Sequence, residues 1–412
     1  MNKCNSIIKV SIFGSFLLFI LLSQASCSGL HHQTMSESVK LPEAGTPYLD
    51  PDSMSRNDIY HLPTGTLLSQ SELFALLATP RIVYVGEGHD NIYDHQVELT
   101  VIKNLYRQHA GKLVVGFEML AHVNQEKIDL WAAGKLSDDD FIRLFAADWG
   151  VADFIYYQDI FTYLKAHGIP IRALNVSRRE KMEFMRGTMV VPDKTEKSRL
   201  TDVAIDPYQE KALRAMFKGH AEGHGNLEMF IKVQQLWEKT MAHNISAYLD
   251  SPAGAGKFMA VIAGGFHIEH GYGLPRRVFQ KTKLNYASVL TYTPAELVEN
   301  ERRVMNVDFP DLPLYLCDYL WCVPYRNLKD KQARLGIGMQ QSDRGIEVVM
   351  VEPESAAAKY GLRVGDVIVA GDGKVLKNPL DLSIMLLHVT KGDVIELQVE
   401  RGSEQLKLDI RL

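Results

Sequence analysis

The stretch Arg81-Ile82-Val83-Tyr84-Val85-Gly86-Glu87-Gly88-His89-Asp90 decides the fold of this chain. Its apolar residues run without alternation, which predicts a short strand buried on both faces, as in parallel sheets. Two glycines then bracket a carboxylate, and we expect a sharp turn there because glycine tolerates positive φ. Ligands of open α/β sheets bind beyond the carboxyl ends of strands. This stretch therefore predicts a site at Glu87, His89 and Asp90.

Three later apolar runs also end in polar side chains. Glu118 follows the run 113–117, Asn175 and Arg178 follow the run 169–174, and His267 follows the run 258–263 within Gly264-Gly265-Phe266-His267. The first and last sites share the pattern Gly-x-x-His. Parallel strands bring such ends to one edge of a sheet, so we expect these side chains to lie near Glu87 and His89.

Helical spacing between the runs sets the fold class. Val97, Val101, Ile102 and Leu105 recur at the spacing of one helix face, between the first two predicted strands. A strand–helix–strand order implies parallel pairing of those two strands with a right-handed crossover. Because strands and helices keep alternating to about residue 324, we predict an α/β domain over residues 59–324, with a mostly parallel mixed sheet covered by helices on both faces.

The strand-end residues admit three interpretations. Two histidines and a carboxylate, here His89, Glu118 and His267, suit a divalent metal such as zinc or manganese. A carboxylate beside an imidazole, such as Glu87 beside His89, could instead act as a catalytic acid–base pair. The same residue types also occur as caps and turns that bind local backbone, and the sequence leaves these interpretations open.

Aromatic residues add a further candidate. Met119, Tyr93, Tyr156 and Tyr157 could contact a planar cofactor, and tyrosine or histidine can ligate haem iron. Tyrosines among apolar positions are more often core residues. The pattern alone therefore does not assign them to a cofactor.

Composition limits the function classes. The chain has 412 residues, 46% of them hydrophobic and 23% charged, which is ordinary for a folded protein of two or three domains. The formal net charge is −5, and no run of lysine and arginine follows the N-terminus. Nucleic-acid binding needs clustered positive charge, so we expect no nucleic-acid partner.

The first 27 residues predict export. Lys3 and Lys9 precede an apolar segment at 12–22, and small residues then lead to Cys27, as in a secretory signal peptide. Gln24-Ala25-Ser26-Cys27 is similar to a bacterial lipobox, in which the cysteine is lipidated, but glutamine replaces the usual leucine. Lipidation of Cys27 would anchor the chain at a membrane, whereas ordinary cleavage near Ala25 would release it. We expect a periplasmic protein or an outer-membrane lipoprotein in either case.

Two further segments bear on this interpretation. Residues 28–58 are polar and contain three prolines, which predicts a flexible tether. Cys317 and Cys322 could pair in an oxidising compartment or remain buried thiols. Five residues along one strand point their Cβ atoms to opposite faces, which favours the thiols.

The region from about residue 67 to residue 323 resembles the ChaN-like haem-binding family. The resemblance rests on separate motifs in the same order. They are Val85-Gly86-Glu87-Gly88-His89-Asp90, Gly116-Phe117-Glu118-Met119, Asn175-Val176-Ser177-Arg178, Gln235-Leu236-Trp237-Glu238-Lys239-Thr240-Met241-Ala242 and Ala263-Gly264-Gly265-Phe266-His267. Bulky Phe266 departs from the small polar residue that is common in the family.

The resemblance implies haem binding and a role in iron acquisition, often as a surface or periplasmic lipoprotein. The family looks related in fold to TraB/Tiki-type metalloproteases and erythromycin esterases, which share two Gly-x-x-His motifs and a glutamate. It implies a shared pocket with Glu87, His89, Glu118 and His267, to which we add Asn175 and Arg178 as cofactor contacts. It does not identify an iron ligand.

Residues 331–412 resemble a bacterial PDZ domain. Arg334-Leu335-Gly336-Ile337-Gly338 is similar to the loop that binds a peptide carboxylate through backbone N–H groups. The resemblance implies that a partner's C-terminal peptide adds as a strand beside Ile337 to Gln340. A helix at 379–388 would form the other wall, with Leu382, Met385 and Leu386 in the pocket. A PDZ fold without peptide binding is the alternative, because fold does not secure function.

Three functional hypotheses follow. The first is an exported protein that binds haem or another iron-containing ligand and uses its PDZ domain to recognise a partner's C-terminus. The second is a metal-dependent hydrolase or peptidase that uses both Gly-x-x-His motifs and Glu118. The third is a non-catalytic PDZ scaffold.

Overall fold

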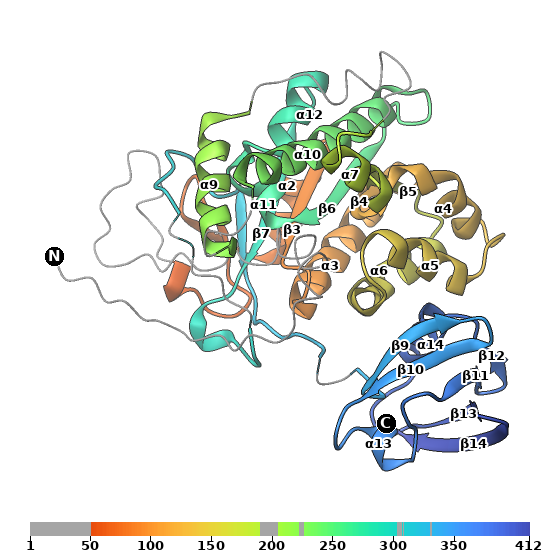
Figure 1. The fold of residues 1–412 in the computed structure, drawn as a ribbon. Coiled ribbons are helices and arrows are strands. Elements are labelled where there is room, and N and C mark those ends of the chain that lie inside the picture. The colour runs from red at the N-terminus through yellow and green to blue at the C-terminus, as the bar shows by residue number, and fades with distance from the viewer. Residues whose placement is uncertain (1–50, 190–204, 222–225, 303–306, 308, 330–331) are drawn as a thin grey trace.

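The computed structural model describes residues 51–189, 205–221, 226–302, 307, 309–329 and 332–412, without the side chains of 219–221. Within this part the chain forms an α/β unit and a smaller β-rich unit at the C-terminal end (Figure 1). The predicted signal peptide, Cys27 and most of the predicted tether lie outside the described residues.

The α/β unit is built on an eight-stranded sheet with the order β2-β1-β8-β7-β3-β6-β4-β5. The six strands from β8 to β5 are parallel, while β1 is antiparallel to β2 and to β8. This mixed, mostly parallel sheet agrees with the predicted fold class. The strand bounds are β1 Ile59–His61, β2 Thr66–Leu68, β3 Ile82–Glu87, β4 Leu113–Ala121, β5 Ile171–Asn175, β6 Phe258–Gly264, β7 Tyr286–Tyr292 and β8 Tyr319–Cys322.

Helices cover both faces of the sheet (Figure 1). One face packs against α2 Gln70–Leu77, α3 Ile92–Gln108, α4 Gln125–Ala132, α5 Asp138–Asp148 and α6 Phe154–Ala166. The other face packs against α7 Arg178–Met185, α10 Leu227–Asp250, α11 Gly265–Ile268 and α12 Leu274–Thr282, with α9 Pro207–Ala221 beside α10.

Strand β3 shows how the sequence forms both cores at once. Val83 and Val85 enter the core under α3 and α6, whereas Ile82 and Tyr84 enter the core under α10 and α12. Successive side chains of a strand point to opposite faces, so a run that is apolar throughout is buried on both. Glu87 continues the Val83–Val85 side of this alternation and points toward α3.

Two local expectations about the strand ends were wrong. Gly86 and Gly88 do not adopt positive φ; instead, a Cβ on Gly86 would lie 2.1 Å from Leu290 Cδ2, so glycine is needed there for close packing. Strand β4 does not stop before Glu118 but continues to Ala121, because the chain stays extended past its last pairing with β6.

The predicted pairing of the first two strands was also wrong. Strands β3 and β4 are parallel members of one sheet, but β6 lies between them and pairs with both. The sequence order indicates the crossover, but it does not show that a strand 140 residues later inserts between the two. That insertion is a long-range event that local patterns cannot encode.

Two smaller features concern the tether and the cysteines. Pro51–Ser53 form a short 3-10 helix, and Met54 is buried, so the end of the predicted tether packs on the α/β unit. Cys317 and Cys322 are free and buried, which agrees with the thiol interpretation.

The C-terminal unit is a six-stranded antiparallel sheet in which β9 Ile337–Ser342 is an edge strand. The order β14-β13-β11-β10-β9 includes β10 Gly345–Val351, β11 Val367–Gly371, β13 Val394–Arg401 and β14 Glu404–Arg411, with β12 Lys374–Val375 beside β11. Helices α13 Ala356–Lys359 and α14 Pro379–Leu387 complete the unit.

Helix α14 is shared between the two units. Leu382 lies in the core of the C-terminal unit, whereas Ile384 belongs to the core of the α/β unit. Asp381 pairs with Arg143 of α5 at 2.6 Å. The two units therefore make both apolar and ionic contacts.

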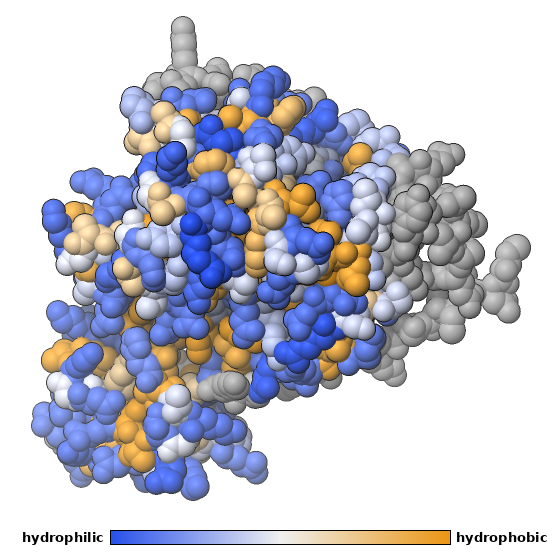
Figure 2. All heavy atoms as spheres, turned by 180° about the vertical axis from the view of Figure 1, so that it is seen from behind, coloured by the Kyte–Doolittle hydropathy of each residue, from blue (hydrophilic) through white to orange (hydrophobic). Residues whose placement is uncertain are grey.

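The surface seen from behind is mostly hydrophilic, with apolar residues in small groups (Figure 2). None of the helices in the described part of the chain combines the length and apolar character that a membrane crossing requires.

Candidate functional site

Buried polar side chains gather at the carboxyl ends of the parallel strands, in two groups. The first, which we call the Glu87 cluster, consists of Glu87, His89, His95, Glu98 and Tyr157. The second, the Glu238 cluster, consists of Glu118, Gln209, Glu238, His267 and Arg277. The first uses α3 and α6 on one face of the sheet, and the second uses α9, α10 and α12 on the other.

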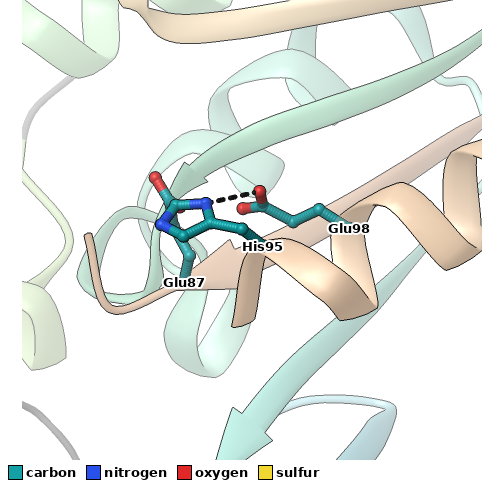
Figure 3. Close-up of side chains that lie close together, drawn as sticks. All are labelled: Glu87, His95 and Glu98. Atoms are coloured by element: carbon teal, nitrogen blue, oxygen red, sulfur yellow. Dashed lines mark hydrogen bonds and ion pairs between the residues drawn. The ribbon is translucent and has the colours of Figure 1, made fainter. Parts of the chain in front are cut away.

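Glu87 is the centre of the first cluster. Its Oε1 accepts hydrogen bonds from Tyr157 Oη at 2.7 Å and from His89 Nδ1 at 2.8 Å. Its Oε2 lies 3.0 Å from His95 Nδ1, which is also 2.9 Å from Glu98 Oε2. His95 and Glu98 are three residues apart on α3, so both project from one helix face toward the end of β3 (Figure 3).

These groups shift one another's protonation. Burial alone would raise the pKa of Glu87, but His95 and His89 hold it well below its usual value. Burial alone would lower the pKa of His95, but the carboxylates of Glu87 and Glu98 raise it well above its usual value. Burial and then the nearby Glu87 raise the pKa of Glu98. The favoured state therefore places one negative charge on Glu87, a proton on Glu98 and a positive charge on His95.

The second cluster surrounds Glu238 with donors. Gln209 Nε2 donates to both carboxylate oxygens at 2.6 and 2.7 Å, and Arg277 Nε donates to Oε2 at 3.0 Å. His267 lies between two carboxylates, with Nδ1 3.3 Å from Glu238 Oε1 and Nε2 3.4 Å from Glu118 Oε1. Glu118 Oε2 accepts the backbone N–H of Gly264 at 2.8 Å, which ties the end of β6 to β4.

Both carboxylates of this cluster are held ionised. Burial would raise the pKa of Glu238, but hydrogen bonding to His267 and the charge of Arg277 lower it. Burial would likewise raise the pKa of Glu118, and His267 lowers it. The Glu238 cluster is thus a hydrogen-bonded network in which a guanidinium offsets one of the two carboxylates.

A hollow opens between β4, β5 and α7 beside these clusters. It is shallow and partly open to solvent, with a cavity volume of about 20 Å³. The residues that line it include two indoles, a thioether, two cationic side chains and several polar groups: Glu118, Met119, Ala121, Asp148, Trp149, Asn175, Val176, Ser177, Arg178, Lys181 and Trp237. Trp149 also packs edge-on against His89, with ring centroids 4.8 Å apart, which connects the hollow to the Glu87 cluster.

Helix α7 presents the cationic side chains to this hollow. Ser177 and Glu180 form a capping box at its start, and the backbone N–H of Arg178 donates to Asp148 at 2.7 Å. Lys181 lies 5.3 Å from the Trp237 ring, and burial lowers its pKa to about 8. Arg178 and Lys181 are thus held one turn apart at the hollow by a fixed helix terminus.

The structure places the predicted site residues in two separate groups. Glu118, Asn175 and Arg178 line the hollow, and His267 lies behind Glu118. Glu87 and His89 belong to the other cluster. Among the described residues, the one group of three potential ligand residues whose ligand atoms all lie within 4.8 Å of one another is Glu87, His95 and Glu98. The set His89, Glu118 and His267 does not form such a group, and its role as a metal site stays a prediction.

Sequence reasoning missed several residues of both clusters. His95 and Glu98 carry a detectable signal, since they are polar residues three apart on the apolar helix that follows Glu87. Glu238 lies in a motif that was recognised but was not assigned to the site. Phe266 does not face the hollow; it is fully buried in a separate apolar cluster with Met216 and Tyr272.

In the C-terminal unit, the predicted peptide site divides between groove and core. Gly336 has φ of 74°, and Ile337 and Gly338 begin the edge strand β9. Met385 and Leu386 are partly buried, whereas Leu335 and Leu382 are buried in the core of this unit. An edge strand with a neighbouring helix is the arrangement to which peptides add as a further strand.

Comparison with known proteins identifies both units. The family model described as "Haem-binding uptake, Tiki superfamily, ChaN" matches residues 73–278, half of the chain. The chain belongs to this family. A PDZ model matches residues 333–412, which confirms the second resemblance.

Solved structures were found for both units. The structure of cofacial haem binding to ChaN of Campylobacter jejuni covers 66% of this chain and 97% of that chain, with 15% identity and a TM-score of 0.49. The HtrA3 PDZ domain bound to a phage-derived ligand covers 20% of this chain and 85% of that chain, with 26% identity and a TM-score of 0.18.

Curated relatives match over short lengths. A probable CtpA-like serine protease of Staphylococcus haemolyticus is 32% identical over 78 residues, which are 19% of this chain. A probable periplasmic serine endoprotease DegP-like of Brucella suis is 29% identical over 84 residues, 20% of this chain. The match spans 16% of the length of each relative.

Proposed function

We propose that this ChaN-family chain binds haem or another iron-containing ligand in the hollow between β4, β5 and α7. The observation that carries the proposal is the lining, which combines Trp149, Trp237 and Met119 with the cationic Arg178 and Lys181. Aromatic and thioether groups suit the face of a flat apolar macrocycle, and basic side chains suit its carboxylates. The chemistry of the lining residues therefore suits haem, which would supply iron at this site.

Haem titration of the purified chain tests this proposal. We expect a Soret shift at micromolar haem, and we expect Arg178→Ala and Lys181→Ala each to weaken binding about tenfold, since each removes a charge-assisted contact. Arg179→Ala is the matched control, because Arg179 is the next residue of α7 and pairs instead with Glu183 at the exposed surface. Absence of a Soret shift, or equal effects of Arg178→Ala and Arg179→Ala, would contradict the proposal.

We also propose that the PDZ domain recognises the C-terminal peptide of a partner protein. The edge strand β9 and the left-handed Gly336 support this interpretation, because they match the requirements of strand addition and carboxylate binding. Fluorescence anisotropy with a C-terminal peptide library tests it. Peptides that bind should lose binding when their C-terminal carboxylate is amidated, and equal binding of amidated peptides would contradict carboxylate recognition.

Export and lipid anchoring through residues 1–27 complete the proposal. It rests on the charged and apolar segments before Cys27 and on the lipobox-like Gln24-Ala25-Ser26-Cys27. Expression of the full chain in a bacterium with labelled fatty acid tests it. Wild type should incorporate label and partition with membranes, whereas Cys27→Ala should not; a labelled variant or an unexported wild type would contradict the proposal.

A metal-dependent hydrolase remains the second candidate. It is favoured by Glu118, which lines the hollow and lies 3.4 Å from His267 as a carboxylate–imidazole pair. Hydrolysis of peptide or ester substrates that is lost in Glu118→Gln and His267→Gln would favour it over simple ligand binding. If both variants kept full biological activity and removal of the PDZ domain abolished it, the scaffold hypothesis would be correct.

A further inference from the structure

Glu87, His95 and Glu98 direct their polar atoms at one point. His95 Nδ1 lies 3.0 Å from Glu87 Oε2 and 2.9 Å from Glu98 Oε2, and Figure 3 shows the three side chains close together, with a dashed line from the imidazole to Glu98. The three side chains are at most 2% exposed. None of them lines the hollow, so this group is distinct from the proposed haem site.

The orientation of His95 is fixed from behind. Its Nε2 lies 3.2 Å from the backbone carbonyl oxygen of His89. A carbonyl oxygen only accepts, so Nε2 carries the hydrogen and Nδ1 faces the carboxylates. Histidines that bind metals are held in this way, with one ring nitrogen on the ion and the other donating to a carbonyl or carboxylate.

Hydrogen bonding does not satisfy the two carboxylates. Nδ1 can carry one hydrogen, and it bonds to Glu98 Oε2. Glu87 Oε2 and Glu98 Oε1 are buried and receive no hydrogen bond from outside the group of Glu87, His95 and Glu98. In the described structure no lysine or arginine pairs with either carboxylate. Buried carboxylate oxygens without donors are costly, and a cation at this point would satisfy both.

The distances indicate the type of cation. Imidazole nitrogen and carboxylate oxygen bind zinc and similar ions at about 2.0–2.2 Å. Two such donors at right angles, as in octahedral coordination, are roughly 3.0 Å apart, whereas tetrahedral donors are roughly 3.4 Å apart. The observed 2.9 and 3.0 Å match the octahedral spacing. Glu98 Oε1, which has no other partner, could supply a further donor.

We propose that Glu87, His95 and Glu98 form a site for a six-coordinate divalent transition-metal cation such as Mn²⁺ or Fe²⁺. The site lies between β3 and α3 and joins the sheet to the helix. Tyr157 holds Glu87 Oε1 from α6, so bound metal also fixes a third element. Its role is to lock the wall behind His89, which contacts Trp149 of the hollow.

Metal content of the purified chain tests this proposal without haem. Because the site is buried, manganese is supplied during expression, and bound metal is measured after gel filtration. Wild type should retain about one manganese ion per chain, and removal by chelator should lower the melting temperature. Glu98→Gln and His95→Gln should each weaken retention about tenfold to a hundredfold.

Glu269→Gln is the matched control. Glu269 is a similarly buried glutamate that belongs to neither cluster, so this variant should retain metal like wild type. Glu98→Asp, which keeps the charge but shortens the reach, gives a second variant if Glu98→Gln folds poorly. Zinc retained in place of the supplied manganese would contradict the assignment to manganese or iron. Absence of bound metal in wild type, or full retention in both Glu98 variants, would refute the site, and neither result depends on haem binding.

Discussion

The Glu87 and Glu238 clusters both place two glutamates around a histidine, on opposite faces of one sheet, yet they differ in charge balance. Each has two glutamates that face an imidazole. In the Glu238 cluster, Arg277 and Gln209 provide the additional donors. In the Glu87 cluster the additional donors are Tyr157, which is neutral, and His89, and two carboxylate oxygens receive no hydrogen bond from outside the cluster.

The difference separates a structural network from a candidate binding site. A buried carboxylate with a guanidinium and an amide is satisfied by the protein itself. A buried pair of carboxylates without a guanidinium or ammonium partner must take up a proton or a cation. We therefore expect removal of a partner to destabilise the protein in the Glu238 cluster. In the Glu87 cluster we expect stability to depend on the proton or cation that is bound.

The largest expected effect is in the Glu238 cluster. Arg277→Met leaves Glu238 as a buried charge without its counterion, so the free energy of unfolding should fall by about 3–5 kcal/mol. Urea unfolding measures this loss of unfolding free energy. Arg276→Met is the control, because Arg276 is half-exposed and its pair with Asp206 is long at 3.5 Å. A loss below about 1 kcal/mol for Arg277→Met would show that the cluster is not balanced by that pair.

The next largest loss of stability is expected when the Tyr157 hydroxyl, which donates to Glu87, is removed. Tyr157→Phe removes a hydrogen bond to an ionised carboxylate, so metal-free protein should lose about 2 kcal/mol of unfolding free energy. Tyr163→Phe on the same helix is the control, since that ring is only partly buried and should change stability little. Equal losses of unfolding free energy in the two variants would contradict our assignment of Glu87 as an ionised carboxylate.

The partly exposed pair of Glu180 and His122 is expected to make stability depend on pH. Burial would raise the pKa of Glu180, but hydrogen bonds from His122 and Ser177 lower it to about 2. A depressed acid pKa adds stability above the unfolded value near 4.5, and that stability is lost as pH falls toward 2. After allowance for solvent screening we expect about 1 kcal/mol.

Unfolding between pH 5 and pH 2 measures this contribution. Glu180→Gln should flatten the acid dependence of stability, whereas Glu183→Gln, which removes an exposed partner of Arg179, should leave it unchanged. Identical acid profiles for wild type and Glu180→Gln would contradict the assignment.

The smallest effect is expected at Glu98. Its raised pKa means that metal-free folded protein holds it protonated, so Glu98→Gln should change unfolding free energy by less than about 1 kcal/mol in chelator. The folded state prefers the protonated acid, so wild type loses stability relative to the variant as pH rises. A large loss of unfolding free energy for Glu98→Gln in chelator would show that Glu98 is ionised and hydrogen-bonded, as Glu238 is.

Much of the fold could be predicted from local patterns. The apolar runs at β3, β4, β5 and β6 are strands, and the spacing of Val97, Val101 and Leu105 is a helix. These patterns depend on side chains within one element, so a single sequence contains them. The PDZ unit was predicted differently, from the resemblance of its loop and helix motifs to those of known PDZ domains.

The arrangement of the site could be predicted only in part. Glu87, Glu118, Asn175, Arg178 and His267 do lie at one edge of the sheet. Their division into two clusters depends on β6 inserting between β3 and β4 and on which helices cover each face. The insertion of β6 joins residues more than a hundred positions apart, which no local pattern specifies.

The sequence by itself determined which strands are buried and which polar residues end them, because burial on both faces requires an unbroken apolar run. It also determined the two families of domain. Only the tertiary structure decided that Glu87 meets His95 and Glu98 while Glu118 meets His267 and Glu238. The reason is physical: a buried carboxylate takes its charge state from the donors that packing brings to it, and those donors come from α3 on one face and from α10 and α12 on the other.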